Sequence, residues 1–451
     1  MAEETAGGGV AVNYPQRVEL PVLRGQLVSG MSITLLEVSI LVWAPGQAAV
    51  DARAALVGDL DVGDGSELRF TSAKMQIEHL DSLAHKGPLG PYRYPQSSEP
   101  YLNVTWSVDG VPESTQKWSE AGLEVTYSFD SLISAPDGFG FQLSFSPTVI
   151  VVTSKPITFD AWVSSWLLPL RQLVSLATGK EERITYFDLE LAGEGRDFDD
   201  QQSSLRELAG IPDFELPRSF RTLQVYASGI TQEPFASQYK DVQSRPAAFH
   251  VGRDEVSLLQ LLKGWQEAST EHHPLLETYG AFIGDRRQHP RLKYLLLIQA
   301  LEGLHGFETR ADWKARVDQH LDRRAAVLSA SALSYLPSAD GRFLKENLGK
   351  RPLSSLDAAL NYCLSTLPID QKGALGATQL VRGVVEDKRA DSVLAALRVV
   401  RNDLAHGNRG YDARELHKAG EILERVTRAH MLRVLGCSSA VIERFLGNPS
   451  Q

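Results

Sequence analysis

Up to about residue 155 of the 451-residue chain, apolar and polar positions alternate with a period of two. In residues 123–130, Leu123, Val125 and Tyr127 alternate with polar residues, which predicts a half-buried strand. Turns rich in Gly, Pro and Asp separate it from similar runs, which cover residues 32–42, 101–108, 139–152, 184–191 and 223–226. Many short strands of this kind predict antiparallel sheets in a sandwich or an open barrel.

Residues 156–177 have helical spacing instead, with Trp162, Trp166 and Leu170 on one side. The two tryptophans could form a platform for a ligand. An apolar stripe at this spacing is more often packed against a sheet, and we expect that arrangement here.

From about residue 254 the apolar residues recur with a period of 3.6, and this pattern continues to the end. The predicted helices cover residues 255–267, 291–305, 312–329, 355–365, 378–387, 391–406, 412–435 and 440–446. The predicted fold class is therefore α+β. An antiparallel β-rich N-terminal domain occupies residues 1–253, with a flexible tail at 1–14, and an all-α helical bundle occupies residues 254–451.

The composition is that of a soluble globular protein, with 43% hydrophobic and 23% charged residues. The N-terminus lacks the basic and apolar segments of a signal peptide, and no run of about eighteen apolar residues is present to span a membrane. The two cysteines, Cys363 and Cys437, favour a reducing compartment over a disulfide framework. We expect a cytoplasmic protein without a membrane partner.

The net charge of −10 argues mildly against a general nucleic-acid binder. The acidity belongs to the front, however. Residues 301–451 contain 22 Lys and Arg against 18 Asp and Glu, and are slightly basic. The helical part can therefore bind an RNA backbone, and Arg425 and Arg428 are candidate contacts. The alternative is that these residues are simply part of a solvated helix face.

The segment from Arg401 to Gly407 has the form R-N-x-x-x-H at the end of a predicted helix. A guanidinium can hold a phosphate, and an imidazole can move a proton near neutral pH. These are the two tools needed to cleave RNA without a metal. At 100° per residue, Asn402 and His406 lie opposite the core stripe, which is formed by Val393, Leu397, Val400 and Leu404.

The position of His406 makes the usual interpretation of a lone histidine, a satisfied core residue, a poor one here. An ordinary solvated helix face remains the alternative, because R-x4-H is a short pattern. Gly407 stands where a C′ glycine ends a helix, so His406 lies in the last turn, where the helix dipole favours imidazolium.

Two segments together resemble the ApeA-like HEPN ribonucleases of bacterial anti-phage defence. Residues 291–305 contain an apolar stretch followed by Q-A-L-E-x-x-H, which ends at Glu302 and His305, and Arg401–Gly407 resembles the catalytic helix. The β-rich front resembles the domain that accompanies this type. The resemblance implies a HEPN core over about residues 290–451 and a metal-independent endoribonuclease that acts as a toxic effector in abortive infection.

The resemblance also implies a homodimer with its cleft between two protomers, an RNA substrate, a phage-derived trigger and no cofactor. His406 would act as general acid or base, Arg401 would stabilise the transition state, and Asn402 would orient one of the reacting groups. Glu302 and His305 would have supporting roles. A surface or structural carboxylate is an equal alternative for Glu302, and the assignment of His305 is weaker.

The sequence contains no metal-binding motif, since adjacent His272 and His273 have no partner at ligand spacing. Two other function classes stay open. One is a non-catalytic HEPN module that binds a nucleotide or a protein. The other is a ligand-binding β-sandwich in which the helical bundle serves only dimerisation.

Overall fold

A computed structural model describes residues 2–4, 10–12, 16–44, 47–58, 68–84, 87–88, 115–133, 143–192, 222–233, 247–283, 288–333, 337–349 and 355–447. The chain divides into two compact units. The first contains residues 1–178 and 182–262, and the second contains residues 263–451 together with 179–181. The division falls within helix α5 (Leu258–Thr270), slightly after the boundary proposed from the sequence at 253/254.

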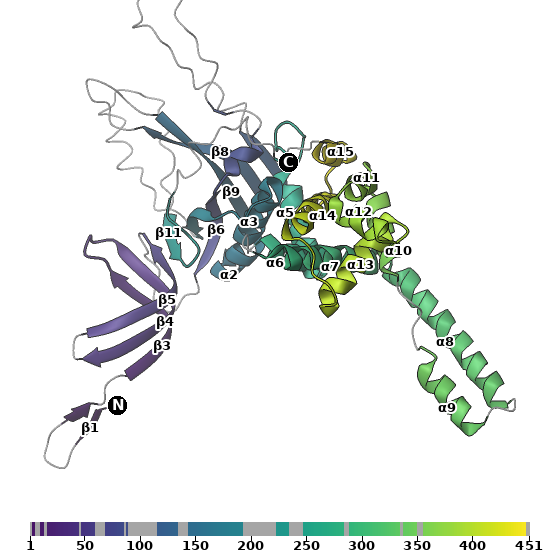
Figure 1. Ribbon diagram of the computed structural model, residues 1–451. Coiled ribbons are helices and arrows are strands. Elements are labelled where there is room, and N and C mark those ends of the chain that lie inside the picture. Colours follow the sequence, from purple (N-terminus) through teal and green to yellow (C-terminus); the bar gives the residue numbers. More distant parts are fainter. Residues whose placement is uncertain are drawn as a thin grey trace, which may run out of the picture. The chain divides into compact units, whose positions relative to one another are not determined.

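A nine-stranded antiparallel sheet dominates the first unit (Figure 1), with strand order β3-β4-β5-β11-β10-β6-β9-β8-β7. Its strands are β3 (Gln16–Gln26), β4 (Ser32–Ala44), β5 (Gln47–Val57), β6 (Arg69–Ile77), β7 (Gln116–Glu120), β8 (Leu123–Ile133), β9 (Leu143–Thr158), β10 (Ile184–Leu191) and β11 (Thr222–Ala227). A 3₁₀ turn, η1 (Leu80–Leu83), follows β6.

One face of the centre of this sheet is apolar. Val125 and Tyr127 of β8 are fully buried, and their register with Val151 and Val149 of β9 brings four apolar side chains together on that face. The helical segments α2 (Phe159–Trp162), η2 (a π-helical turn, Val163–Leu167) and α3 (Leu168–Thr178) follow β9 directly.

The two tryptophans pack as expected from their spacing. Trp162 is fully buried and Trp166 is 6% exposed. The Trp162 indole N–H donates to the Phe70 carbonyl of β6 at 3.2 Å. The helix begins at Phe159, later than predicted, because β9 extends through Thr158, whose hydroxyl accepts from Ala161 N at 3.3 Å and caps the helix.

The α+β class with an antiparallel β-rich front is confirmed. Nine of the described strands form one open sheet, and helices cover its apolar face in place of the stacked second sheet of a sandwich. The predicted flexible tail contains a separate two-stranded sheet, β1 (Ala2–Glu4) with β2 (Val10–Val12). The strand predicted at residues 101–108 lies outside the described residues.

The opposite face of the sheet centre is polar. On this face Lys74 of β6 lies opposite Asp188 of β10, and the Lys74 ammonium pairs with Asp130 of β8 at 2.5 Å. The Tyr186 hydroxyl donates to Asp188 at 2.5 Å. Burial raises the pKa of Asp188 to about 6, with a smaller increase from Asp130, while Tyr186 and Lys74 act in the other direction.

Replacing Asp188 by Asn should reduce the stability that the protein loses between pH 4 and pH 7. Because the pKa of Asp188 in the folded chain (about 6) lies above its ordinary value of 3.8, its contribution to stability is complete below about pH 4. That contribution is lost as the pH rises through 6. Relative to wild type, Asp188→Asn should therefore gain on the order of 1–3 kcal/mol between pH 4 and pH 7.

Denaturant unfolding of the full chain at both pH values tests this expectation. The exposed Asp51→Asn is the matched control, and it should show no such gain. An Asp188→Asn variant whose stability follows that of wild type at both pH values would contradict the argument.

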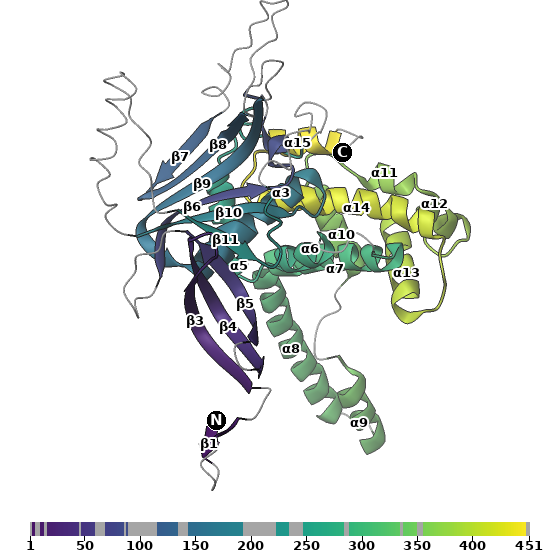
Figure 2. The same cartoon turned by 90° about the vertical axis from the view of Figure 1, so that its left-hand side faces the viewer.

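The second unit is helical (Figure 2). Its helices, with α5 shared between the units, are α6 (Pro274–Ile283), α7 (Pro290–Glu308), α8 (Arg310–Leu333), α9 (Ser338–Asn347), α10 (Leu356–Ser365), α11 (Lys372–Gly376), α12 (Gln379–Glu386), α13 (Val393–His406), α14 (Ala413–Val434) and α15 (Ser439–Gly447). Every helix predicted in this half is present. Helices α6, α9 and α11 were not predicted from the sequence, and they have 10, 10 and 5 residues.

The core of the helical unit forms around α7. Its buried residues recur at helical spacing, as Tyr294, Leu297 and Leu301 do, and form a stripe facing the neighbouring helices. Lys293 of α7 pairs with Glu424 of α14 at 2.6 Å. Among the described residues, no helix is long and apolar enough to cross a membrane.

Candidate active site on helix α13

Helix α13 has a defined start and a defined end. The Ser392 hydroxyl accepts from Ala395 N at the start. At the end, Gly407 adopts a left-handed conformation (φ 72°), and its N–H donates to the Asp403 carbonyl. This confirms the predicted C′ glycine, because a side chain at positive φ would be strained. His406 is therefore the last residue of the helix.

One side of α13 is buried as the sequence pattern predicts. Leu397 and Val400 are fully buried, Leu404 is 2% exposed, and Val393 at the start is half-buried. This side fixes the rotation of the helix about its own axis. Ala395, Ala396 and Asp403 next to it are buried as well, whereas Ala405 and His406 are exposed.

Two polar contacts from α7 attach to the α13 backbone. The Tyr294 hydroxyl donates to the Leu397 carbonyl at 3.0 Å, and the Arg291 guanidinium donates to the Leu404 carbonyl. The Leu404 carbonyl belongs to the last turn, where carbonyls lack partners within the helix. The positive charge of Arg291 at that end also interacts favourably with the negative pole of the helix dipole.

The motif residues lie where this rotation sends them. Arg401 is half-buried on the flank, and its guanidinium lies 3.7 Å from the Glu302 carboxylate of α7 and donates to the Asn402 side-chain oxygen at 3.3 Å. Asn402 is half-buried and His406 is exposed. In the part of the chain that the structure describes, the His406 side chain makes no hydrogen bond or ion pair.

The arrangement offers a cation and a titratable ring at one exposed helix end. Arg401 keeps free donors because its side chain is 35% exposed and its contact with Glu302 is long for an ion pair. His406 can reach a proton on a bound molecule without first breaking an internal contact.

Asp403 is the site residue that the sequence analysis missed. It is 7% exposed, and its carboxylate accepts from Arg389 at 2.6 Å and from the Tyr411 hydroxyl at 2.5 Å. Arg389 also donates to the Tyr411 hydroxyl at 3.0 Å. Burial by itself would raise the pKa of Asp403, but the bonds from Tyr411 and Arg389 lower the pKa overall. The burial of Asp403 could have been predicted from the sequence, because Asp403 follows Val400 by three residues and so lies on the buried side of the helix.

His305 lies in a different environment. Its ring packs edge-on against Tyr362 of α10 at 5.2 Å, and the Tyr362 hydroxyl donates to Glu308 at 2.9 Å. Among the described residues, no hydrogen bond, ion pair or ring contact joins His305 to Arg401 or His406.

The predicted solvated face of α14 needs a correction at Arg428. This residue is only 7% exposed, and its guanidinium lies 4.8 Å from the ring centroid of Phe445 on α15. The cation–π contact buries a charge that the sequence analysis expected on the surface. Arg425 is half-buried. A phosphate contact at Arg428 would require the α14–α15 packing to open.

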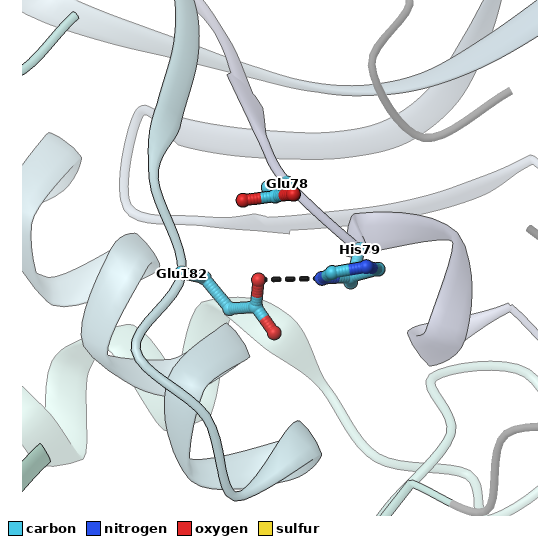
Figure 3. Close-up of side chains that lie close together, drawn as sticks. All are labelled: Glu78, His79 and Glu182. Atoms are coloured by element: carbon cyan, nitrogen blue, oxygen red, sulfur yellow. Dashed lines mark hydrogen bonds and ion pairs between the residues drawn. The ribbon is translucent and has the colours of Figure 1, made fainter. Parts of the chain in front are cut away.

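A cluster that could hold a metal lies in the first unit (Figure 3). One ligand atom from each of Glu78, His79 and Glu182 lies within 4.8 Å of the others. The sequence analysis found no metal-ligand cluster, because Glu182 is distant from the other two in the sequence and no spacing motif joins them. Within the described residues, this is the one group of three or more such side chains that could hold a metal ion.

Comparison with known families gives one result. The family model described as ApeA N-terminal domain 1 matches residues 9–206, which include all three members of this cluster. Comparisons with curated proteins and with solved structures give no match. The match does not extend to α13.

Removing the Tyr411 hydroxyl should destabilise the helical unit. Tyr411→Phe leaves the buried Asp403 and the half-buried Arg389 each without one partner, which costs about 1–3 kcal/mol. Denaturant unfolding measures this loss, with unchanged circular dichroism under native conditions. Tyr226→Phe is the matched control, because Tyr226 is 41% exposed and its hydroxyl donates to the Gln224 side chain. Equal stabilities for both variants would show that the Asp403 contacts contribute little.

Proposed function

We propose that this chain, whose residues 9–206 match the family model described as ApeA N-terminal domain 1, is an RNA-cleaving effector of anti-phage defence. The activity is that of a HEPN-type, metal-independent endoribonuclease. The family match supports the anti-phage setting, and the arrangement on α13 is the basis for the chemistry.

One observation carries the proposal. Arg401, Asn402 and His406 lie within six positions of α13 and outside its buried side. The helix is held in place by its buried residues and by hydrogen bonds from α7. A structural role explains buried polar residues such as Asp403, but it does not explain His406, which is exposed. A role in binding and proton transfer does explain that residue.

In the proposed reaction the ribose 2′-oxygen attacks the neighbouring phosphorus. The bond from phosphorus to the 5′-oxygen of the next nucleotide breaks. His406 removes the 2′-hydroxyl proton or protonates the departing 5′-oxygen. Arg401 donates to the phosphoryl oxygens as negative charge develops on them, and Asn402 orients the phosphate or the imidazole. Glu302 holds the Arg401 guanidinium through the 3.7 Å contact, and no cofactor takes part.

One exposed histidine supplies only one proton-transfer group. The second comes, in this proposal, from His406 of another copy of the chain, placed across a two-fold axis near the ends of the two α13 helices. RNA binds at the slightly basic helical part. The first unit restrains the nuclease until a phage-derived trigger is present.

Loss of either motif residue should abolish cleavage without unfolding the chain. Arg401→Ala and His406→Ala should each lower the cleavage rate by about 10²–10⁴-fold, because each removes a group that acts in the transition state. Cleavage is measured on purified RNA, with 2′,3′-cyclic phosphate expected at the new ends. Thermal unfolding should stay close to that of wild type.

Arg409→Ala and His417→Ala are the matched controls, since they remove the same types of side chain from exposed positions outside the motif. Cleavage by wild type should also continue in EDTA, and so should cleavage by Glu78→Gln, which separates the chemistry from the cluster in the first unit. Activity that is lost in EDTA and restored by magnesium would refute the metal-free mechanism.

A cleft between two copies makes activity depend on association. Ala405→Arg places a charge on the exposed end of α13 beside His406, and it should give monomers with strongly reduced cleavage. Glu421→Arg, on the exposed side of α14, should leave both properties unchanged. Light scattering and cleavage are measured on the same samples. A wild type that is a strict monomer at micromolar concentration and fully active would contradict the shared cleft.

A further inference from the structure

We propose that Glu78, His79 and Glu182 form a binding site for a divalent transition-metal ion of the zinc class in the first unit. The site has no part in the proposed cleavage chemistry and does not depend on it. It rests on how the backbone brings the three side chains together, how the carboxylate of Glu182 is held, and which donor atoms result.

The end of β6 brings two adjacent residues into one cluster. Along a strand, successive side chains point to opposite faces, so neighbours such as Glu78 and His79 would not normally meet at one site. His79 adopts a left-handed conformation with φ 60° and ψ 19°, which ends the extended backbone immediately before η1. Ligand atoms of both side chains then lie within 4.8 Å of one another and of Glu182.

The pairing of β6 with β10 sets the third side chain. Glu78 N donates to the Arg183 carbonyl at 2.8 Å, and Ile184 of β10 lies opposite Ile77 of β6. These backbone contacts place residue 182 beside residues 78 and 79, although it comes from the connection after α3. The three ligands therefore lie just beyond the adjacent ends of β6 and β10.

The carboxylate of Glu182 is oriented from behind. It is 1% exposed, the Thr178 hydroxyl donates to Oε1 at 2.7 Å, and Oε2 lies 2.6 Å from His79 Nδ1 (Figure 3). The Glu182 N–H donates to the Ser175 hydroxyl at 3.1 Å. Outer hydrogen bonds of this kind fix the carboxylate ligands of metal sites and tune their affinity.

The charges of the cluster suit a divalent cation. Two carboxylates lie beside one imidazole, and Arg183 pairs with Glu78 from a side chain that is 55% exposed. Because this side chain is largely exposed, Arg183 can turn toward solvent when a metal binds to Glu78.

The donor set selects the class of metal. One imidazole nitrogen with two carboxylate groups suits Zn²⁺ and related first-row ions, whereas Ca²⁺ and Mg²⁺ favour all-oxygen sites. Three protein ligands are the number found in zinc sites that keep a position open for water or another molecule.

Calorimetric titration of the full, tag-free, metal-stripped chain with Zn²⁺ tests the proposal. We expect one site per chain with an oxygen and nitrogen environment by X-ray absorption, because a sulfur signal would indicate Cys363 or Cys437 instead. Glu78→Gln should weaken binding by more than about tenfold, and Thr178→Val by about 10–100-fold.

Two further variants distinguish a metal site from a buried ion pair. Arg183→Gln removes the competing cation and should tighten Zn²⁺ binding by roughly two- to fivefold. His250→Gln is the matched control, since His250 lies 3.5 Å from Asp254 in the same unit but belongs to no cluster of three ligands among the described residues. It should bind Zn²⁺ as wild type does. No saturable binding, or equal binding by wild type and Glu78→Gln, would overturn the proposal.

Discussion

The burial of one side of α13 is the constraint on which the candidate site depends. Leu397, Val400 and Leu404 leave the helix only one rotation about its axis, and this rotation exposes His406 and places Arg401 on the flank. The apolar side of α13 therefore sets the direction in which the Arg401 and His406 side chains point.

Polar contacts make that position more specific than packing could. Arg291 and Tyr294 of α7 bind carbonyls of α13, and the buried Asp403 binds Arg389 and Tyr411, which lie on either side of it in the sequence. A buried carboxylate with these partners is costly to displace, because moving α13 would leave charges and donors unpaired. The motif arginine and histidine are thus carried by a helix that is held on its buried side and at its end.

Much of this arrangement follows from the sequence. The period of 3.6 and the glycine at 407 predict α13, its buried side and its end, because a helix repeats its environment at a fixed spacing. Short or weakly periodic elements such as α11 do not give that signal. The single open sheet was not predicted, since alternation shows that a strand is half-buried but not whether helices or a second sheet cover it.

Contacts between distant segments are the part that the sequence could not supply. Glu182 joins Glu78 and His79 only through the pairing of β10 with β6, and Arg428 is buried only because α15 brings Phe445 over it. Asp403 is intermediate, since its position on the buried side is readable while its partners are not. Local pattern thus located the motif, and the tertiary contacts around it had to come from the structure.

Chemical rescue tests most directly the claim that the imidazole of His406 moves the proton. Imidazole added to His406→Gly should restore a measurable part of RNA cleavage, with the pH dependence of the added base, and should leave Arg401→Ala inactive. A cleaving wild type whose His406→Gly variant cleaves equally well without imidazole would contradict the account, because proton transfer would then belong to another residue.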